Sequence, residues 1–362
     1  NLCYQYRYDG WNRLVEKKLP GKGWEYMIYD RQGRLIMGQD ALLRTNNNTF
    51  GAKGWMVTKY DKLGRVVYSG FYPSTDSRAT LQNNVNSLMV NVENNEERNT
   101  TFFTTNNLEV YYTQNAFPSG SITVLSVNYY DTYPSYSFNP AFPASVFGQE
   151  IMTDTQNAPV STKGLPTLSL IKNIEDNEWT KNYVYYDTKG RAVVAHSINY
   201  LGGYSRTESE LDFTGAIKQT KAYHKRLSTD TERVIVQNFE YDDQNRLEKQ
   251  WHNVDGLSDE LLVENTYNEL SQLTNKKTGN GLQSIDYTYN VRGAVTKVND
   301  PANLGLHLFG YELRSFNPQN TGSATGKYNG NITEVDWKTS TDNILRRYNY
   351  QYDPLNRLKK GI

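Results

Sequence analysis

The sequence has little cysteine and no excess of charge of either sign. Cys3 is the only cysteine among 362 residues, which excludes an internal disulfide and a cysteine-based metal cluster. The 39 basic residues balance 39 acidic ones and form no basic stripe, so nucleic acid is not an expected partner. No apolar run approaches the ~20 residues of a membrane-spanning helix, and no signal peptide is visible.

The usual signatures of an enzyme are also missing. The four histidines are widely separated, and none has a cysteine or carboxylate at metal-ligand spacing. They are His196, His224, His252 and His307. The stretch Gly279–Gly281 lacks the helix and lysine of a phosphate-binding loop, and no nucleophile-elbow sequence occurs. We therefore expect a non-enzyme with no catalytic residue, no metal ligand and no cofactor.

Tyrosine, in contrast, is abundant. There are 29 tyrosines, and aromatic residues make up 13% of a chain that is only 37% hydrophobic. Tyr4, Tyr6 and Tyr8 alternate with other residues, which is typical of a β-strand. This composition favours strands with one half-polar face over a dense helical core. Aromatic stripes of this kind pack across strands or stack on sugars, and we favour cross-strand packing.

A short motif recurs along the chain and indicates a repeat architecture. It consists of Tyr-Asp, two variable residues, Gly or Asn, Arg, and then usually an aliphatic residue. The motif residues of the six full copies are Tyr8, Asp9 and Arg13; Tyr29, Asp30, Gly33 and Arg34; Tyr60, Asp61, Gly64 and Arg65; Tyr186, Asp187, Gly190 and Arg191; Tyr241, Asp242, Asn245 and Arg246; and Tyr352, Asp353, Asn356 and Arg357.

Each copy is predicted to form the turn of a β-hairpin. The Asp carboxylate accepts hydrogen bonds from backbone N–H groups just after it. Gly or Asn, three residues after Asp, stands where a three-residue hairpin loop needs a left-handed residue. Weaker copies begin at Leu211, Tyr267 and Tyr289, and Asn329–Ile332 keeps only the turn half. Because Asp and Arg recur at every turn, we interpret them as structural residues and not as a catalytic pair.

The pattern divides the chain into three segments within one continuous β-architecture. Residues 1–70 and 183–362 carry the hairpin repeats. Residues 71–182 are rich in Asn, Thr, Ser and Pro and are predicted to form an atypical β-rich insertion or cap. This segment is a plug or binding face in one interpretation and a set of long surface loops in the other, which we favour. No segment has helical periodicity over more than about two turns.

The repeats at 1–70 and 183–362 resemble those of the rearrangement-hotspot (RHS), or YD-repeat, family. This family includes bacterial polymorphic toxins, the cocoon-forming components of insecticidal toxin complexes, and teneurins. Four further stretches look like those of the long YD-repeat proteins of Bacteroidota: Gly23–Tyr26, Ser126–Asp131, Leu308–Leu313 and Gly326–Ile332.

The resemblance implies a fold and a type of function. The implied fold is all-β: a spiral of antiparallel hairpins that forms part of a hollow shell, or cocoon. In the family the shell often encloses a C-terminal toxin that is released by self-cleavage. Asp353-Pro354 lies in a turn copy here and does not match the self-cleavage signature, so no protease or toxin module is carried over.

We therefore expect a structural shell segment of an exported YD-repeat protein. The chain begins and ends close to repeat motifs, so we expect it to be part of a longer protein. Its expected partners are its own C-terminal cargo module, such as a toxin or effector, and the type IX translocon used by Bacteroidota. The expected location is the cell surface or the exterior. The alternative is a cell-surface adhesin or carbohydrate-binding contact protein, with surface glycans as partners.

Overall fold

The computed structural model describes residues 3–88 and 94–362 and divides the chain into two compact units. Unit 1 comprises residues 1–210 and 222–233, and unit 2 comprises residues 211–221 and 234–362. The chain passes from one unit to the other after Glu210, Lys221 and Arg233, and the second of these positions lies within strand β16 (Ile217–Leu227). Residues 1–2 and 89–93, which belong to the predicted segments 1–70 and 71–182, lie outside the described residues.

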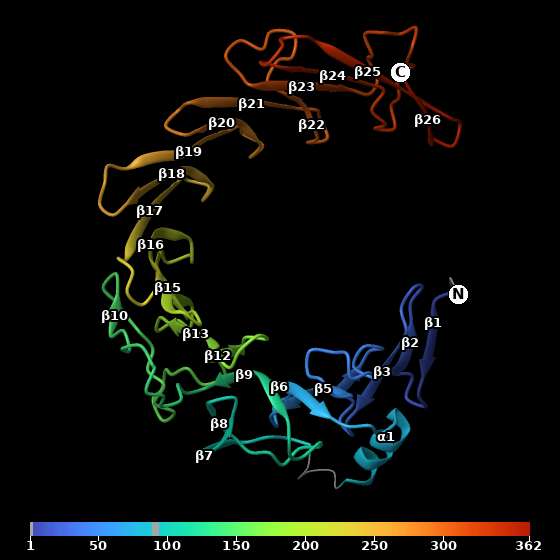
Figure 1. Cartoon of the computed structure of the whole chain (residues 1–362). Helices are drawn as coiled ribbons and strands as arrows, with labels where there is room; N and C mark the ends of the chain where they lie inside the picture. Colours follow the sequence, from blue (N-terminus) through green and yellow to red (C-terminus); the bar gives the residue numbers. More distant parts are fainter. Residues whose placement is uncertain (1–2, 89–93) are drawn as a thin grey trace. The chain divides into compact units, whose positions relative to one another are not determined.

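Unit 1 is built on a sheet whose neighbouring strands are antiparallel (Figure 1). The strand order is β1-β2-β3-β4-β5-β6-β9-β12-β13-β14-β15. The bounds are β1 (Gln5–Tyr8), β2 (Leu14–Lys18), β3 (Trp24–Tyr29), β4 (Leu35–Gln39), β5 (Gly54–Tyr60), β6 (Val66–Pro73), β9 (Thr123–Tyr130), β12 (Pro166–Lys172), β13 (Trp179–Tyr186), β14 (Ala192–Ile198) and β15 (Gly202–Leu211). Two small hairpins stand apart from it: β7 (Arg98–Thr105) with β8 (Leu108–Tyr112), and β10 (Ser145–Val146) with β11 (Gln149–Glu150).

The segment 71–182 contributes both to this sheet and to a second layer. Strands β9 and β12 continue the hairpin sheet between β6 and β13. Two of its other parts, around Tyr112 and Tyr133, pack on the sheet through aromatic rings. Tyr112 stacks on Tyr129 with ring centroids 5.2 Å apart, and Tyr133 stacks on Tyr185 at 5.1 Å. The buried core of unit 1 therefore lies between the sheet and these covering segments.

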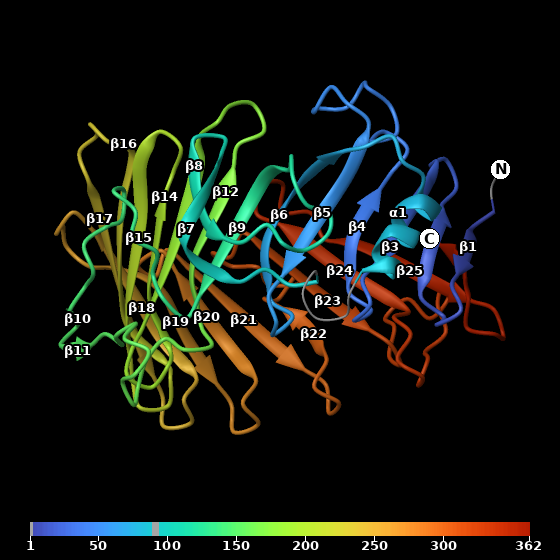
Figure 2. The same ribbon diagram turned by 90° about the horizontal axis from the view of Figure 1, so that it is seen from below.

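One helix, α1 (Arg78–Ser87), packs against β3 (Figure 2). The sequence showed no helical periodicity over more than about two turns, so this 10-residue helix was not predicted. The Ser77 side chain caps the helix by accepting from the N–H of Thr80, which is a recognisable start signal. Leu81 and Val85, four residues apart, are its buried residues, and two apolar positions were too few to reveal the period.

Unit 2 is a run of antiparallel strands paired in chain order from β17 to β26. The bounds are β17 (Arg233–Tyr241), β18 (Leu247–Val254), β19 (Glu260–Tyr267), β20 (Leu273–Thr278), β21 (Gln283–Tyr289), β22 (Val295–Val298), β23 (Phe309–Arg314), β24 (Glu334–Thr339), β25 (Arg346–Tyr352) and β26 (Leu358–Gly361). Every residue of β17–β21 is half-buried or exposed, so this part of the unit is a single layer of sheet.

Polar contacts on the sheet surface replace a second layer in this part of unit 2. The Asn275 amide donates to the hydroxyl of Ser284 at 2.7 Å and to the carboxylate of Asp286 at 2.6 Å. The ammonium of Lys277 in β20 pairs with the carboxylate of Glu264 in the neighbouring strand β19 at 3.0 Å. Cross-strand pairs of this type each contribute about 0.2–1 kcal/mol.

Across the described ranges 3–88 and 94–362, no helix combines the length and apolarity required to span a bilayer.

Candidate functional site

The repeated turn has the same geometry in all six full copies. In the third copy the N–H of Asp61 donates to the carbonyl of Arg65 at 2.9 Å, and the N–H of Gly64 donates to the carbonyl of Asp61 at 3.0 Å. The Asp61 carboxylate accepts from the backbone N–H groups of Leu63 and Arg65, both at 2.9 Å, and from Nε of Arg65 at 2.6 Å. One carboxylate therefore closes the loop and orients the arginine. Asp9, Asp30, Asp187, Asp242 and Asp353 make the same three contacts.

These hydrogen bonds favour the ionised carboxylate. The N–H of Arg246 donates to Asp242 at 2.9 Å and is the main cause that lowers the pKa of Asp242 below its ordinary value. The pKa of Asp353 is lowered in the same way by the N–H of Arg357. Because the folded-state pKa values of Asp242 and Asp353 are depressed, the stability that these two carboxylates contribute is present above pH ~4 and is lost as the pH falls below it.

The residue three positions after Asp has positive φ in every full copy. Gly33, Gly64 and Gly190 have φ of +79°, +78° and +78°, and Asn245 and Asn356 both have +61°. In the first copy the residue is Asn12, with φ of +60°. The strand pairing shifts by one residue next to each of these turns, as in a three-residue loop that ends in a bulge.

Replacing Gly64 by Val is expected to destabilise the chain through the backbone alone. A side chain added at Gly64 meets nothing within 4 Å, so the cost arises from placing a β-branched residue at φ of +78° and amounts to about 1–2 kcal/mol or more. Gly10 is the matched control, because it belongs to the first copy, has open space and is not among the residues with positive φ. Urea unfolding measures both variants, and equal losses of stability in Gly64→Val and Gly10→Val would contradict the turn geometry.

Four of the motif arginines, Arg13, Arg34, Arg65 and Arg246, also contact the next hairpin. The guanidinium of Arg13 lies 4.8 Å from the ring centroid of Tyr29, and that of Arg34 lies 4.8 Å from the ring of Tyr60. Arg246 lies 4.5 Å from the ring of Tyr267 in unit 2. The same guanidinium groups donate to a carbonyl of the following turn: Arg13 to Asp30 at 3.4 Å, Arg34 to Asp61 at 3.1 Å and Arg246 to Asn268 at 3.3 Å.

The motif tyrosines return this contact. The hydroxyl of Tyr29 donates to the carbonyl of Leu14 at 2.8 Å, and that of Tyr60 donates to Leu35 at 2.8 Å. In each case the acceptor directly follows the arginine that stacks on the tyrosine ring. Five further tyrosines donate in the same manner to the preceding hairpin: Tyr186, Tyr241, Tyr267, Tyr289 and Tyr352. We call this combination of Arg-on-Tyr stacking and Tyr-to-carbonyl hydrogen bonding the inter-hairpin clamp.

Tyr130 and Asp131 complete the clamp after the third full copy. Arg65 lies 4.4 Å from the ring of Tyr130, and its two terminal nitrogens bond both oxygens of Asp131 at 3.2 and 2.9 Å. The hydroxyl of Tyr130 donates to Val66 at 3.0 Å. A clamp of the same kind thus joins β6 to β9, although these strands are far apart in the sequence. The sequence Tyr-Asp signalled this position, but its turn lacks the Gly and Arg that mark the other copies.

One turn of the same type was missed in the sequence. Asn199 accepts at 2.9 Å from the N–H groups of both Leu201 and Gly203, and Gly202 has φ of +79°. An Asn followed after three residues by Gly was the available signal. Asn199 stands in the place of the Asp, and the motif's preceding Tyr and following Arg are both missing, so this turn provides the loop geometry without the arginine of a clamp.

A buried ion pair joins segment 94–118 to β5. Lys59 is 1% exposed, and its ammonium donates to Glu96 at 3.3 Å, to the carbonyl of Pro118 at 2.7 Å and to that of Ala116. Burial lowers the pKa of Lys59 to about 8, and Glu96 opposes that shift. Sequence reasoning missed this pair because its members are 37 residues apart and belong to different predicted segments.

Glu96 accepts four hydrogen bonds besides the one from Lys59. The Tyr68 hydroxyl donates at 2.9 Å and the Thr113 hydroxyl at 2.7 Å. The backbone N–H groups of Asn115 and Ala116 donate at 2.9 and 3.1 Å. A fully buried carboxylate with this many donors organises the surrounding chain and does not resemble a catalytic acid that must exchange protons with a substrate.

A second buried charge network lies across β23–β25 in unit 2. Arg314 bonds Glu334 at 2.8 Å and Asp336 at 2.6 Å, and Arg347 bonds both oxygens of Asp336 at 2.6 and 2.7 Å. Glu334 also accepts from backbone N–H groups of the loop that precedes β24. The network therefore ties that loop to the sheet by charge-assisted hydrogen bonds.

The histidines are dispersed, as their sequence positions suggested. His196 is partly buried between Tyr183 and Tyr204, and burial lowers its pKa to about 4. His224 bonds the hydroxyl of Ser205 at 2.8 Å. His252 and His307 lie beside single carboxylates, those of Glu260 and Asp286. Within residues 3–88 and 94–362, no group of three or more His, Cys, Asp or Glu side chains is arranged to hold a metal ion.

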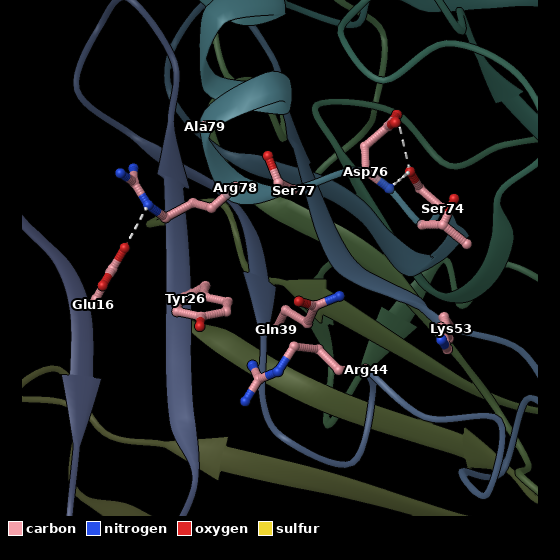
Figure 3. Close-up of a pocket in the computed structure, with 11 residues that line it drawn as sticks. Glu16, Tyr26, Gln39, Arg44, Lys53, Ser74, Asp76, Ser77, Arg78 and Ala79 are labelled. Carbon is pink, nitrogen blue, oxygen red and sulfur yellow. Dashed lines mark hydrogen bonds and ion pairs between the residues drawn. The ribbon is translucent and has the colours of Figure 1, made fainter.

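A cavity of about 440 Å³ opens beside the start of α1 in unit 1 (Figure 3). Strands β2–β4 supply Glu16, Tyr26 and Gln39, and the chain before β5 supplies Arg44 and Lys53. The remaining lining residues are Ser74, Thr75, Asp76, Ser77, Arg78 and Ala79. The cavity is mostly polar, and it was not foreseen, because its lining residues come from five separate places in the sequence.

Comparisons with known proteins bear on the fold. No protein-family model and no curated protein matches the sequence. The crystal structure of TcdB2-TccC3-Cdc42 is similar with a TM-score of 0.56 and 12% identity, and that of TcdB2-TccC3 without the hypervariable C-terminal region with 0.54 and 11%. Each match covers 98% of this chain and 14% of the other chain. At these identities the likeness shows the fold alone, and it confirms the predicted all-β fold of antiparallel hairpins.

Proposed function

We propose that this chain is a structural segment of a YD-repeat shell that encloses or displays a C-terminal module, and that it performs no chemistry itself. The observation that carries the proposal is the inter-hairpin clamp, which recurs in both units. A clamp joins one hairpin to the next, so it supports extension of a sheet and not the assembly of a single reaction centre. The similarity over 98% of the chain to part of TcdB2-TccC3 agrees with this role.

The thin sheet of β17–β21 suits a wall. Its residues are half-buried or exposed on both faces, and its cross-strand contacts are largely polar. A two-layer core gains stability mainly from apolar burial, whereas this part of unit 2 relies on hydrogen-bonded strands and on clamps such as that of Arg246 with Tyr267.

Protease protection in the full-length parent protein tests the proposal. Arg34→Ala together with Arg65→Ala removes two clamps, and we expect the C-terminal module to become digestible at lower protease concentration than in the unaltered protein. Arg292→Ala is the control, because Arg292 is exposed at a weaker turn and its guanidinium makes no hydrogen bond, ion pair or ring contact with another described residue. A module digested equally in all three proteins would contradict enclosure.

One observation favours the alternative function of a surface that binds glycans. Phe316 and Tyr328 stack with ring centroids 6.1 Å apart, and they are 60% and 83% exposed in the loop between β23 and β24. Exposed stacked rings outside the strands are suited to bind sugar rings. Glycan binding that is lost in Tyr328→Ala but kept in Phe213→Ala, an exposed residue at a turn, would support this function. Absence of glycan binding by the unaltered protein would exclude it.

We further propose that the parent protein is exported to the cell surface or the exterior, with the type IX translocon as a partner. The support is the sequence resemblance to long YD-repeat proteins of Bacteroidota, together with a chain whose single cysteine permits no internal disulfide. Such a chain crosses a first membrane unfolded without reduction of disulfides. Fractionation of the native host tests the proposal, and a parent protein found only in the cytoplasm would contradict it.

A further inference from the structure

Strand β1 of unit 1 and strand β26 of unit 2 each have one edge that pairs with no other strand in the part of the chain that the structure describes. β1 pairs with β2, and β26 pairs with β25. All four residues of β26 are exposed, as are three of the four residues of β1. An unpaired edge presents free N–H and C=O groups, so it is a template for a strand of another chain.

The two edges carry opposite halves of the inter-hairpin clamp. At the β26 edge, the guanidinium of Arg357 bonds Asp353 of its own turn at 2.7 Å, and the arginine side chain is 74% exposed. It contacts no tyrosine ring among residues 3–88 and 94–362. At the β1 edge, Tyr8 is 57% exposed, and no described arginine stacks on its ring. One edge therefore has a clamp arginine without a tyrosine, and the other has a clamp tyrosine without an arginine.

The strand register inside the sheet defines how these two halves meet. In four clamps, the third residue after the arginine pairs with the third residue before the tyrosine. These pairs are Glu16 with Tyr26, Met37 with Val57, Tyr68 with Val127 and Lys249 with Glu264. Applied to Arg357 and Tyr8, the same register places Lys360 opposite Gln5. The Tyr8 hydroxyl then faces the carbonyl of Leu358, which follows the arginine as the acceptors of the other clamps do.

This register is also favourable for the side chains along the two edges. Lys359 comes to lie opposite Tyr6, whose ring is 47% exposed and can accept the ammonium on its face. Leu358 lies opposite Arg7, so no two like charges are directly opposed. Two β26 edges, in contrast, would bring Lys359 and Lys360 of both strands together and would supply no tyrosine. The edges are therefore suited to each other and not to themselves.

We propose that the β26 edge of one copy of this chain binds the β1 edge of a second copy, with Arg357 of the first stacked on Tyr8 of the second. The interface continues the backbone pairing and the clamp that already join hairpins within the sheet. Because it joins two different edges, it leads to head-to-tail assembly. The proposal is independent of the shell function, since it requires two strand edges and no enclosed module.

Disulfide cross-linking of the full chain tests the register. The register that pairs Lys360 with Gln5 also places Ile362 of one copy opposite Cys3 of the next, and Cys3 is exposed. Ile362→Cys is therefore expected to give disulfide-linked dimers and longer oligomers under mild oxidation, resolved on a non-reducing gel. Gly361→Cys is the matched control, because adjacent residues of a strand point to opposite faces, and it is expected to link far less.

Sedimentation velocity without oxidation tests the clamp itself. We expect association that grows with protein concentration and that weakens by about fivefold in Arg357→Ala and in Tyr8→Leu. Arg292→Ala is the control and is expected to leave association unchanged, and circular dichroism establishes that each variant is folded. A chain that stays monomeric at every concentration overturns the proposal. Equal cross-linking of Ile362→Cys and Gly361→Cys, or association that neither clamp variant weakens, overturns it as well, because the copies then meet through another surface.

Discussion

Replacing Glu96 by Ala is expected to be among the most damaging single substitutions in unit 1. It removes the carboxylate that pairs with the buried ammonium of Lys59 and that accepts from four further donors, of which the Tyr68 hydroxyl keeps the carbonyl of Thr113 as an acceptor at 3.1 Å. Breaking one partner of a buried ion pair typically costs about 3–5 kcal/mol, and buried donors left unpaired add to this cost. Urea unfolding followed by near-ultraviolet circular dichroism measures the loss.

Lys59→Met serves as the comparison, because it removes the other partner of the same pair. Glu96 then keeps its four other hydrogen bonds, so we expect a smaller loss than for Glu96→Ala. The two variants also differ in how their stability depends on pH, because Lys59→Met removes the titrating ammonium. The depressed pKa of Lys59, about 8, means that the unfolded chain binds more protons between pH 8 and its ordinary value of 10.5, so deprotonation of Lys59 adds stability as the pH rises through that window. A larger loss in Lys59→Met than in Glu96→Ala would contradict the arrangement described.

Raising the pH above ~10, the ordinary pKa of tyrosine, is expected to unfold unit 1. Burial is the main cause that raises the pKa of many tyrosines in this unit, and the shifts are large for six of them: Tyr68, Tyr112, Tyr133, Tyr136, Tyr183 and Tyr185. Since the folded-state pKa is raised, their stabilisation is full below pH ~10 and is lost as the pH rises towards the folded-state values. At one pH unit above ~10, the six tyrosines together are expected to lower the free energy of unfolding by an amount on the order of 8 kcal/mol. This loss is comparable to the whole stability of a typical domain.

Tyr185→Phe isolates one of these tyrosines. Tyr185 is 3% exposed, and burial raises its pKa to about 12. Between pH 10 and 12 the variant is expected to lose stability less steeply than the unaltered protein, by about 1.4 kcal/mol per pH unit. Tyr200→Phe, at a position that is 48% exposed, is the control and is expected to leave the slope unchanged. Identical slopes for Tyr185→Phe and the unaltered protein would show that this phenol does not contribute to alkaline unfolding.

The hairpins and their turns were readable from the sequence because their chemistry is local. An aspartate and a left-handed residue three positions later, as in Asp61 and Gly64, fix a loop through contacts within five residues. Strand periodicity before each turn then determined the fold class. The helix α1 has an equally local cap at Ser77, but its two buried apolar residues gave too weak a pattern.

The long-range contacts were not readable from one sequence. The clamp partner of Arg34 is 26 residues further along the chain and that of Arg65 is 65 residues further, because the connections between hairpins vary in length. The partner of Lys59 lies in a segment whose composition suggested loops. The cavity beside α1 likewise combines residues from five places in the sequence. In each case the chemistry of the residue types was visible, and the pairing required the fold.

A double-mutant cycle between Arg34 and Tyr60 tests the inter-hairpin clamp most directly. Arg34→Met, Tyr60→Leu and the combined variant are compared with the unaltered protein by urea unfolding, which isolates the interaction across the two hairpins. The stacking distance of 4.8 Å and the half-buried setting predict a coupling energy of about 1 kcal/mol.

Arg31→Met with Tyr60→Leu provides the control cycle, because Arg31 belongs to the same turn as Arg34 but bonds the carbonyl of Leu88 instead. This control is expected to be additive within about 0.5 kcal/mol. If the inter-hairpin clamp stabilises the sheet, the Arg34 cycle shows a clear coupling energy and the control cycle is additive. Equal and negligible coupling in both cycles would contradict the claim that the repeated motif joins each hairpin to the next.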